Sequence, residues 1–331
     1  MKTKLPRRNV VQASRWRRQN VCLTVLRFRT LLGISLLFIF LPPTPVLGIP
    51  AASVVKPMLY AQAQTEVQAG LDLVNQGLQL IQQGKLTEAI AVFRQASQID
   101  PGLAAAHYNL GLALRQDGQL QPSADAFYQA TQADPNFALA FANLGAALLE
   151  GNNLQQAKDY LGRAIQLNPK LGVAHYNFGL VMAQQGALDQ AIASFKQAMQ
   201  YSPKAPEPAY HLGLAYLKKG AVDEAKKALQ KAIQISPKYP EAHYDLGSIL
   251  LSQGDLNAAL EAFRKAAEAN SRYANAYYAA GLVFLRQNRY SDAQRVLKYA
   301  KDLYAAQGNT EWANYAEQLL ERSRNSNAQY P

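Results

Sequence analysis

The feature that most constrains this chain is an interval of 34 residues that recurs without insertion or deletion. The phrase AHYNLG at 106–111 returns as AHYNFG at 174–179 and as AHYDLG at 242–247, each two intervals after the last. Prolines from Pro101 to Pro237, glycines from Gly77 to Gly281 and alanines from Ala96 to Ala300 keep the same interval. A fixed period of this length predicts a solenoid of stacked supersecondary units.

Each unit has the pattern of two helices, which we call helix A and helix B. We number the unit from 1 to 34 with Gly70 at position 1. This gives seven repeats at 70–103, 104–137, 138–171, 172–205, 206–239, 240–273 and 274–307. Position 15 is always Gly or Asn, the two residues that best tolerate the left-handed conformation ending a helix. Position 18, with Thr87 and Asp189 among its residues, is predicted to cap helix B. Proline at position 32 should end helix B.

The apolar residues of both helices fall at helical spacing. In helix A of the second repeat, Leu110 and Leu114 share a face with Gly111, the glycine of position 8. Because this glycine has no side chain, it allows another helix to come close. Helix B presents small, large and small residues in turn, as in Ala89, Phe93 and Ala96. The two apolar faces therefore predict a packed helical pair in every unit.

These motifs resemble the tetratricopeptide repeat (TPR) family, whose 34-residue unit has the pattern L-G-x2-aromatic, then A-x3-F, then P. The resemblance covers residues 70–307. It implies an all-α fold, an α-α superhelix or TPR solenoid in which antiparallel helix pairs stack around a concave groove. The chain departs from the family at position 4, where His107, Phe141, His175, His243 or Tyr277 replaces tryptophan.

The two ends of the chain differ from the repeats. Residues 308–331 are predicted to form a capping helix over 310–322, with Thr310 as N-cap, and a loose tail after it. Residues 1–63 are basic, contain the uncharged apolar run 31–41, and end with small residues at Ala61 and Ala63. This order predicts a signal peptide cleaved after Ala63, with an uncleaved membrane anchor or an organelle transit peptide as alternatives. We therefore expect an exported protein, periplasmic or secreted, or one anchored by its N-terminus. Cys22, the single cysteine, lies in this leader.

The distribution of charge argues against nucleic acid as a partner. The chain has a formal net charge of +11. Ten of the 34 Lys and Arg residues lie before residue 65, where no acidic residue occurs, and residues 65–331 hold 24 basic and 23 acidic residues. The repeats are therefore almost neutral and lack the basic footprint of a nucleic-acid-binding domain.

The sequence contains no pattern that predicts catalysis. His107, His175 and His243 are 68 residues apart, form no His-x3-His pair and occupy a packing position. Neither a phosphate-binding glycine loop nor a G-x-S-x-G motif is present. We therefore predict no catalytic residues, no cofactor, no metal and no enzymatic activity.

Two rows of residues are the candidate ligand groove. Positions 2, 5, 6, 9, 12 and 13 share a stripe that lines the concave side in the resembling family. Asparagine both donates and accepts hydrogen bonds and suits an extended peptide backbone, whereas tyrosine offers contact area. Position 6 holds Asn75, Asn109, Asn143, Asn177, His211 and Asp245, and position 5 holds Tyr108, Tyr176, Tyr210, Tyr244 and Tyr278.

The predicted function is that of a non-enzymatic scaffold that binds a peptide segment or a partner protein in this groove. Two alternatives remain from the sequence. The tyrosine row is also consistent with a carbohydrate-binding component of an envelope polysaccharide machine, and the whole array with a structural spacer between other subunits. Membrane contact is expected only through the N-terminal segment, if it is not cleaved.

Overall fold

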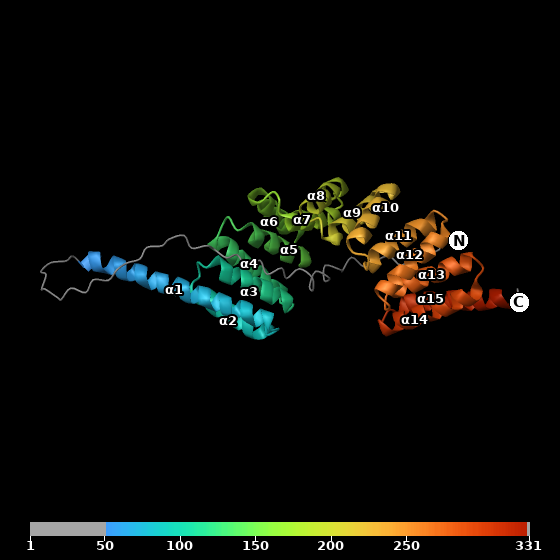
Figure 1. The fold of residues 1–331 in the computed structure, drawn as a ribbon, viewed down its shortest axis with the longest axis horizontal. Helices are drawn as coiled ribbons and strands as arrows, with labels where there is room; N and C mark the ends of the chain where they lie inside the picture. Colours follow the sequence, from blue (N-terminus) through green and yellow to red (C-terminus); the bar gives the residue numbers. More distant parts are fainter. Residues whose placement is uncertain (1–50, 330–331) are drawn as a thin grey trace. The chain divides into compact units, whose positions relative to one another are not determined.

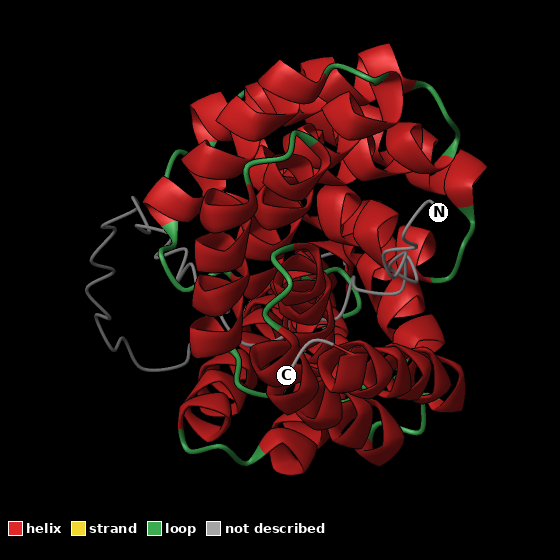
Figure 2. Cartoon of the chain, turned by 90° about the vertical axis from the view of Figure 1, so that its right-hand side faces the viewer, coloured by secondary structure: helices red, strands yellow, loops and turns green. Residues whose placement is uncertain are grey.

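A computed structural model describes residues 51–329, with side chains from residue 64 to residue 325, and this part of the chain is helical without any strand (Figures 1 and 2). It divides into two compact units, an N-terminal unit at 51–151 and a C-terminal unit from 152. The N-terminal unit contains α1 (Ala51–Gln82), α2 (Leu86–Ile99), α3 (Ala104–Gln116), α4 (Leu120–Ala133) and α5 (Ala138–Glu150). The C-terminal unit contains α6 (Leu154–Leu167), α7 (Gly172–Gln184), α8 (Leu188–Tyr201), α9 (Pro206–Lys219), α10 (Val222–Ile235), α11 (Pro240–Ser252), α12 (Leu256–Ala269), α13 (Ala274–Arg286), α14 (Tyr290–Ala306) and α15 (Thr310–Gln329).

Odd-numbered helices up to α13 are the A helices and even-numbered ones the B helices of the predicted pairs. Within each unit a helix packs against its neighbour in sequence. Adjacent A helices also touch directly, α1 with α3 in the N-terminal unit and α7 with α9 and α11 with α13 in the C-terminal unit. Neighbouring B helices approach one another less closely. The A helices therefore form the inner side of each unit, as the TPR solenoid requires.

In each repeat that lies within one unit, the core is one large side chain of helix B inserted against helix A. This residue, at position 24, is at most 1% exposed in every repeat: Phe93, Phe127, Leu161, Phe195, Leu229, Phe263 and Leu297. It lies over the glycine of position 8. A Cβ added to Gly111, Gly179, Gly213, Gly247 or Gly281 would lie 2.6–2.9 Å from it. The predicted close approach at position 8 is confirmed.

The turn from helix A to helix B has the predicted left-handed residue at position 15 in all seven repeats. Its φ lies between 57° and 86° in Gly84, Gly118, Asn152, Gly186, Gly220, Gly254 and Asn288. Nothing lies within 4 Å of a Cβ built on Gly254, so a substitution there meets backbone strain and no steric clash. The sequence therefore identified the residues that end the A helices.

We expect Gly254→Ala to lower the free energy of unfolding by about 1 kcal/mol, because an L-residue is strained in the left-handed region. Asn288→Gly should change it in the opposite direction by a smaller amount, since glycine relieves the same strain. Urea unfolding followed by circular dichroism measures both changes. An unchanged Gly254→Ala variant would contradict the assignment.

The prediction that position 18 caps helix B is wrong. Helix B begins at position 17, so its N-cap is position 16, and only Asp255 makes a side-chain cap there, accepting from the Ala258 N–H at 3.1 Å. Residues of position 18 lie inside the first turn, and two of them, Asp189 and Asn257, bridge repeats instead. The Asn257 Oδ1 accepts from Gln287 Nε2 at 3.0 Å.

The ends of helix B depend on position 31 as well as on the predicted proline. The side-chain oxygens of Asp100, Asp134, Asn168 and Asn270 each accept the N–H two residues later, at 2.9–3.1 Å. The last repeat has Ala305 at position 32, and α14 runs to Ala306, three residues longer than the other B helices. Where proline is missing without such a turn, the helix continues.

The C-terminal helix covers α14, as predicted, and buries Ala316 and Leu320. Two details were wrong. The N-cap is Asn309, whose Oδ1 accepts from the Trp312 N–H at 3.3 Å, and Thr310 is the first helical residue. The predicted loose tail is also helical as far as Gln329, and Ser323 within it is fully buried.

At the N-terminal side, α1 is longer than its partner α2 and starts at Ala51 (Figure 1). The predicted boundary after Ala63 falls inside this helix. The apolar run 31–41 and Cys22 lie outside the described residues. Within residues 51–329, no helix is both long and apolar enough to span a bilayer.

Candidate functional site

The recurring histidines have a structural role. The Nε2–H of His107 donates to the carbonyl of Pro101 at 3.0 Å, and those of His175 and His243 donate to Pro169 and Pro237 at 2.8 Å. Each bond ties helix A to the turn that precedes it, which confirms the packing interpretation. The described residues contain no group of three His, Cys, Asp or Glu side chains placed to hold a metal ion.

The tyrosines of position 5 are buried, with the exception of the half-buried Tyr108. Tyr176, Tyr210 and Tyr278 are 4% exposed and Tyr244 is 3% exposed. The prediction that these four rings offer contact area to a ligand is therefore wrong. The same burial removes the surface on which the carbohydrate alternative depended.

The physical reason is packing within the repeat, between helix A, helix B and the turn that follows helix B. Tyr244 lies 5.7 Å from the Phe263 ring of its own helix B and 5.6 Å from Tyr273, which precedes the next helix A. Tyr210 is likewise covered by Tyr239, at 5.0 Å. The large residues at positions 24 and 34 thus enclose position 5, which a helical wheel of one helix cannot reveal.

Two hydroxyls of position 5, those of Tyr108 and Tyr210, bridge to position 6 of the following repeat. Tyr210 donates to the Asp245 carboxylate at 2.9 Å, and Tyr108 accepts from Asn143 Nδ2 at 3.2 Å. Burial raises the pKa of Tyr108 to about 12, although the Asn143 bond and the Arg115 charge oppose the shift. Position 5 is therefore a structural link between repeats.

Position 6 remains accessible on the inner face of both units. Asn75 is exposed, whereas Asn109, Asn143, Asn177, His211 and Asp245 are half-buried. Asn109 and Asn143 donate through Nδ2 to the carbonyls of Ala105 and Leu139, one turn earlier, at 2.8 and 3.0 Å. These bonds orient the amides and leave each Oδ1 as an acceptor for a ligand N–H.

The structure adds an apolar row that the sequence analysis did not single out. Positions 2, 6, 9 and 13 share one helix face. Position 9 holds four half-buried leucines, which are Leu78, Leu112, Leu180 and Leu214. The 34-residue interval could have shown this row, because leucine recurs there in most repeats. Each inner face thus combines oriented amides with partly exposed leucines.

The inner face of α9 and α11 is acidic at position 2. Glu241 is 4% exposed, and Glu207 is half-buried with its Oε2 buried and without a hydrogen-bond partner. Burial raises the pKa of the Glu207 carboxyl, and its own backbone N–H partly opposes the shift. The two units therefore differ in the chemistry that they present.

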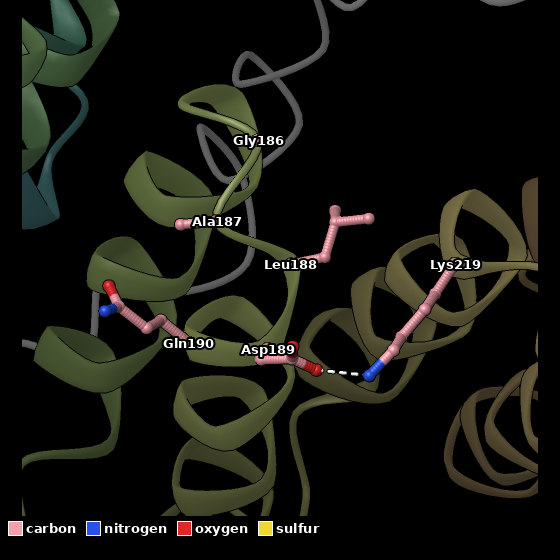
Figure 3. Close-up of a pocket in the computed structure, with 6 residues that line it drawn as sticks. All are labelled: Gly186, Ala187, Leu188, Asp189, Gln190 and Lys219. Carbon is pink, nitrogen blue, oxygen red and sulfur yellow. Dashed lines mark hydrogen bonds and ion pairs between the residues drawn. The ribbon is translucent and has the colours of Figure 1, made fainter.

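A shallow pocket of about 420 Å³ lies where α8 and α9 meet (Figure 3). Lys219 of α9 reaches across it and forms an ion pair with Asp189, near the start of α8. Gly186, Ala187, Leu188 and Gln190 complete its lining. The pair links two repeats, and hydrogen bonding to Asp189 raises the pKa of the Lys219 ammonium group.

Comparison with known proteins agrees with this architecture. Residues 51–282 match the family described as the Cilia and flagella-associated protein 70 C-terminal domain, a TPR family. The fold and its inner faces define a TPR solenoid. The chain belongs to this TPR family, which confirms the resemblance found in the sequence. No curated protein matches the sequence.

Solved structures share the fold. A tetratricopeptide repeat protein from Parabacteroides merdae is 19% identical, with a TM-score of 0.55 over 78% of this chain and 99% of that one. PilF of Pseudomonas aeruginosa is 20% identical, with a TM-score of 0.56 over 62% of this chain and 94% of that one. YrrB, a TPR protein described as having an unusual peptide-binding site, is 27% identical over 56% of this chain and 94% of its own, with a TM-score of 0.45. Family and fold support a protein-interaction scaffold.

Proposed function

We propose that this protein is a non-enzymatic scaffold that binds extended segments of a partner protein along the inner faces of its A helices. The observation that carries the proposal is the pair of oriented amides in the N-terminal unit. A hydrogen bond from Nδ2 to a carbonyl of their own helix fixes the amides of Asn109 and Asn143. The Oδ1 of each amide remains available to accept a hydrogen bond from a ligand. An extended peptide exposes N–H groups that such acceptors can bind, and the leucines at position 9 offer apolar contact beside them.

The C-terminal unit supports the same use with different chemistry. Asn177 has no hydrogen bond with any described residue, so its amide can both donate and accept. His211 lies against the rings of Tyr176 and Tyr210, at 5.6 and 5.1 Å. Because each unit has its own inner face, we treat them as two separate binding surfaces.

The test replaces Asn109, Asn143 and Asn177 with alanine. A random peptide library displayed on phage is selected on the purified protein, and the tightest peptide becomes the probe. We expect the triple variant to bind a peptide held by the N-terminal unit at least about tenfold more weakly, because the lost hydrogen bonds of Asn109 and Asn143 contribute roughly 1 kcal/mol each. A peptide held by the separate surface of the C-terminal unit should lose only the contribution of Asn177. Calorimetry or fluorescence anisotropy measures the change.

A matched control replaces Asn136, Asn153 and Asn314, which are exposed and lie off the inner faces. Their alanine variant should bind the probe as the parent does. Equal binding by the parent and by the Asn109, Asn143 and Asn177 variant would show that these amides do not hold the peptide.

We also propose that the protein is exported and that residues 1–63 are removed, with an uncleaved anchor as the alternative. The basic and apolar composition of the leader supports this proposal. N-terminal sequencing of the protein purified from its host tests it, because cleavage predicts a mature chain that begins at Gln64. A chain that still begins at Met1 would contradict removal.

A further inference from the structure

One edge of the C-terminal unit carries a row of cations, one per repeat. Position 33 is Lys170, Lys204, Lys238 and Arg272 in repeats three to six, and all four side chains are exposed. Each lies in the turn that joins a helix B to the next helix A. We call these four residues the cation row.

No described residue neutralises the cation row. None of its four side chains has an ion pair or a hydrogen bond with a described residue, whereas Arg264 pairs with Glu261 and Lys301 with Glu317. The acidic residues that follow Lys204 and Lys238 most closely, Glu207 and Glu241, are half-buried or buried on the inner face. The row is therefore an unpaired charge array on an otherwise mixed surface.

The backbone beneath the first and last residues of the row is held by a side-chain hydrogen bond. The N–H of Lys170 donates to Asn168 at 3.1 Å, and that of Arg272 donates to Asn270 at 3.0 Å. Packed helices lie on the order of 10 Å apart, so successive cations are separated by roughly one Debye length at moderate salt. A polymer with charges at similar intervals can meet them one after another.

The repeat itself does not require a cation at this position. In the N-terminal unit the same turn is built with Gly102 and Asn136 at position 33, and Asp100 and Asp134 precede them. The turn forms equally well there. The cation row is thus a property of the C-terminal unit alone.

Aromatic rings accompany the row at its C-terminal end. Tyr239 and Tyr273 follow Lys238 and Arg272 directly and are half-buried. Their rings are held by Tyr210 and Tyr244, at 5.0 and 5.6 Å. A fixed ring beside a cation suits a sugar acid, whose C–H face packs on the ring while its carboxylate meets the charge.

We propose that the cation row binds a linear acidic polysaccharide whose carboxylates recur along the chain. A DNA duplex carries one charge per about 1.7 Å, so four cations at this spacing neutralise too little of it. Binding to an anionic bilayer requires cations spread over a plane, whereas the cation row lies along one edge, so a bilayer is not the expected partner. This surface is separate from the inner faces of the A helices.

The experiment uses polygalacturonate as the probe and the purified full chain, at low salt, with calorimetry or biolayer interferometry. We expect binding that weakens as salt rises, because neutralised carboxylates release counterions. The variant Lys170→Ser, Lys204→Ser, Lys238→Ser and Arg272→Ser should bind at least about tenfold more weakly, since it removes four counterion-releasing contacts.

A control variant separates the row from net charge. Lys196→Ser, Lys227→Ser, Lys231→Ser and Lys298→Ser removes four exposed cations from B helices α8, α10 and α14. It should retain polygalacturonate affinity within about twofold, because the charges that it removes lie outside the row. An equal loss in both variants, or no binding of polygalacturonate by the parent, would overturn the proposal.

Three further probes decide the class of partner. Poly-L-glutamate, a short DNA duplex or anionic lipid vesicles that bind more tightly than polygalacturonate would overturn the polysaccharide assignment in favour of an acidic protein, nucleic acid or membrane. Binding of the phage-selected peptide should be unchanged in the cation-row variant. Failure of one proposal is therefore distinguishable from failure of the other.

Discussion

Replacing Gly247 with alanine should lower the free energy of unfolding by about 2 kcal/mol, although alanine is the better helix former. The added Cβ would lie 2.7 Å from Cε1 and 2.8 Å from Cδ1 of Phe263, a ring with no exposed surface. Either the ring leaves its position or α11 and α12 separate. Both responses disrupt the core of the sixth repeat.

Gly162→Ala is the matched control. Gly162 lies within α6, and nothing lies within 4 Å of a Cβ built there. The same substitution should therefore raise the free energy of unfolding by about 0.5–1 kcal/mol through helix propensity alone. Urea unfolding measures both variants. If Gly247→Ala were as stabilising as Gly162→Ala, the close contact between helix A and helix B would be disproved.

The second large effect is expected in alkali. The pKa of Tyr108 is raised to about 12 in the folded protein, mainly by burial, whereas a tyrosine in the unfolded chain ionises near pH 10. The stability that depends on the neutral hydroxyl is therefore complete below pH 10 and is lost as the pH rises to about 12. The loss attributable to Tyr108 is about 3 kcal/mol.

Tyr108→Phe removes this ionisation, so its free energy of unfolding should fall less steeply than that of the parent between pH 10 and pH 12. Tyr128→Phe, at a tyrosine that is 42% exposed, should follow the parent. Urea unfolding at a series of pH values measures the slopes. Identical slopes for Tyr108→Phe and the parent would contradict the raised pKa. Burial also raises the pKa values of Tyr278 and Tyr304. Both variants should therefore still lose part of their free energy of unfolding at alkaline pH.

Features that depend on the direct contact between helix A and helix B, or on the turn between them, were predictable from the sequence. Position 15, position 8 and the large residue at position 24 each follow from the demands of one helical pair. Because each of these positions recurs every 34 residues, the sequence shows the same pattern in seven repeats. The burial of Gly247 beneath Phe263 is a contact between residues of the same repeat, and the pattern of apolar residues was sufficient to predict it.

Features that depend on the turns that precede and follow helix B were missed or misread. Tyr244 was expected to face a ligand because the pattern of α11 alone does not include Tyr273, the ring that covers it. The N-cap positions were wrong for a different reason: the turn after position 15 is short, so helix B starts two residues earlier than a cap at position 18 would require. Asp255 shows the position that the cap takes.

Several of the bonds between repeats share a step of one repeat and one residue. Arg286 donates to the Leu251 carbonyl at 3.2 Å, Gln307 Nε2 donates to that of Arg272 at 2.8 Å, and Tyr210 reaches Asp245 in the same way. A lineage of such chains can therefore lengthen or shorten by whole 34-residue modules, because a module inserted in register keeps this 35-residue spacing at its junctions. Gains or losses of any other size would put each donor opposite the wrong acceptor, so that length evolves in discrete steps.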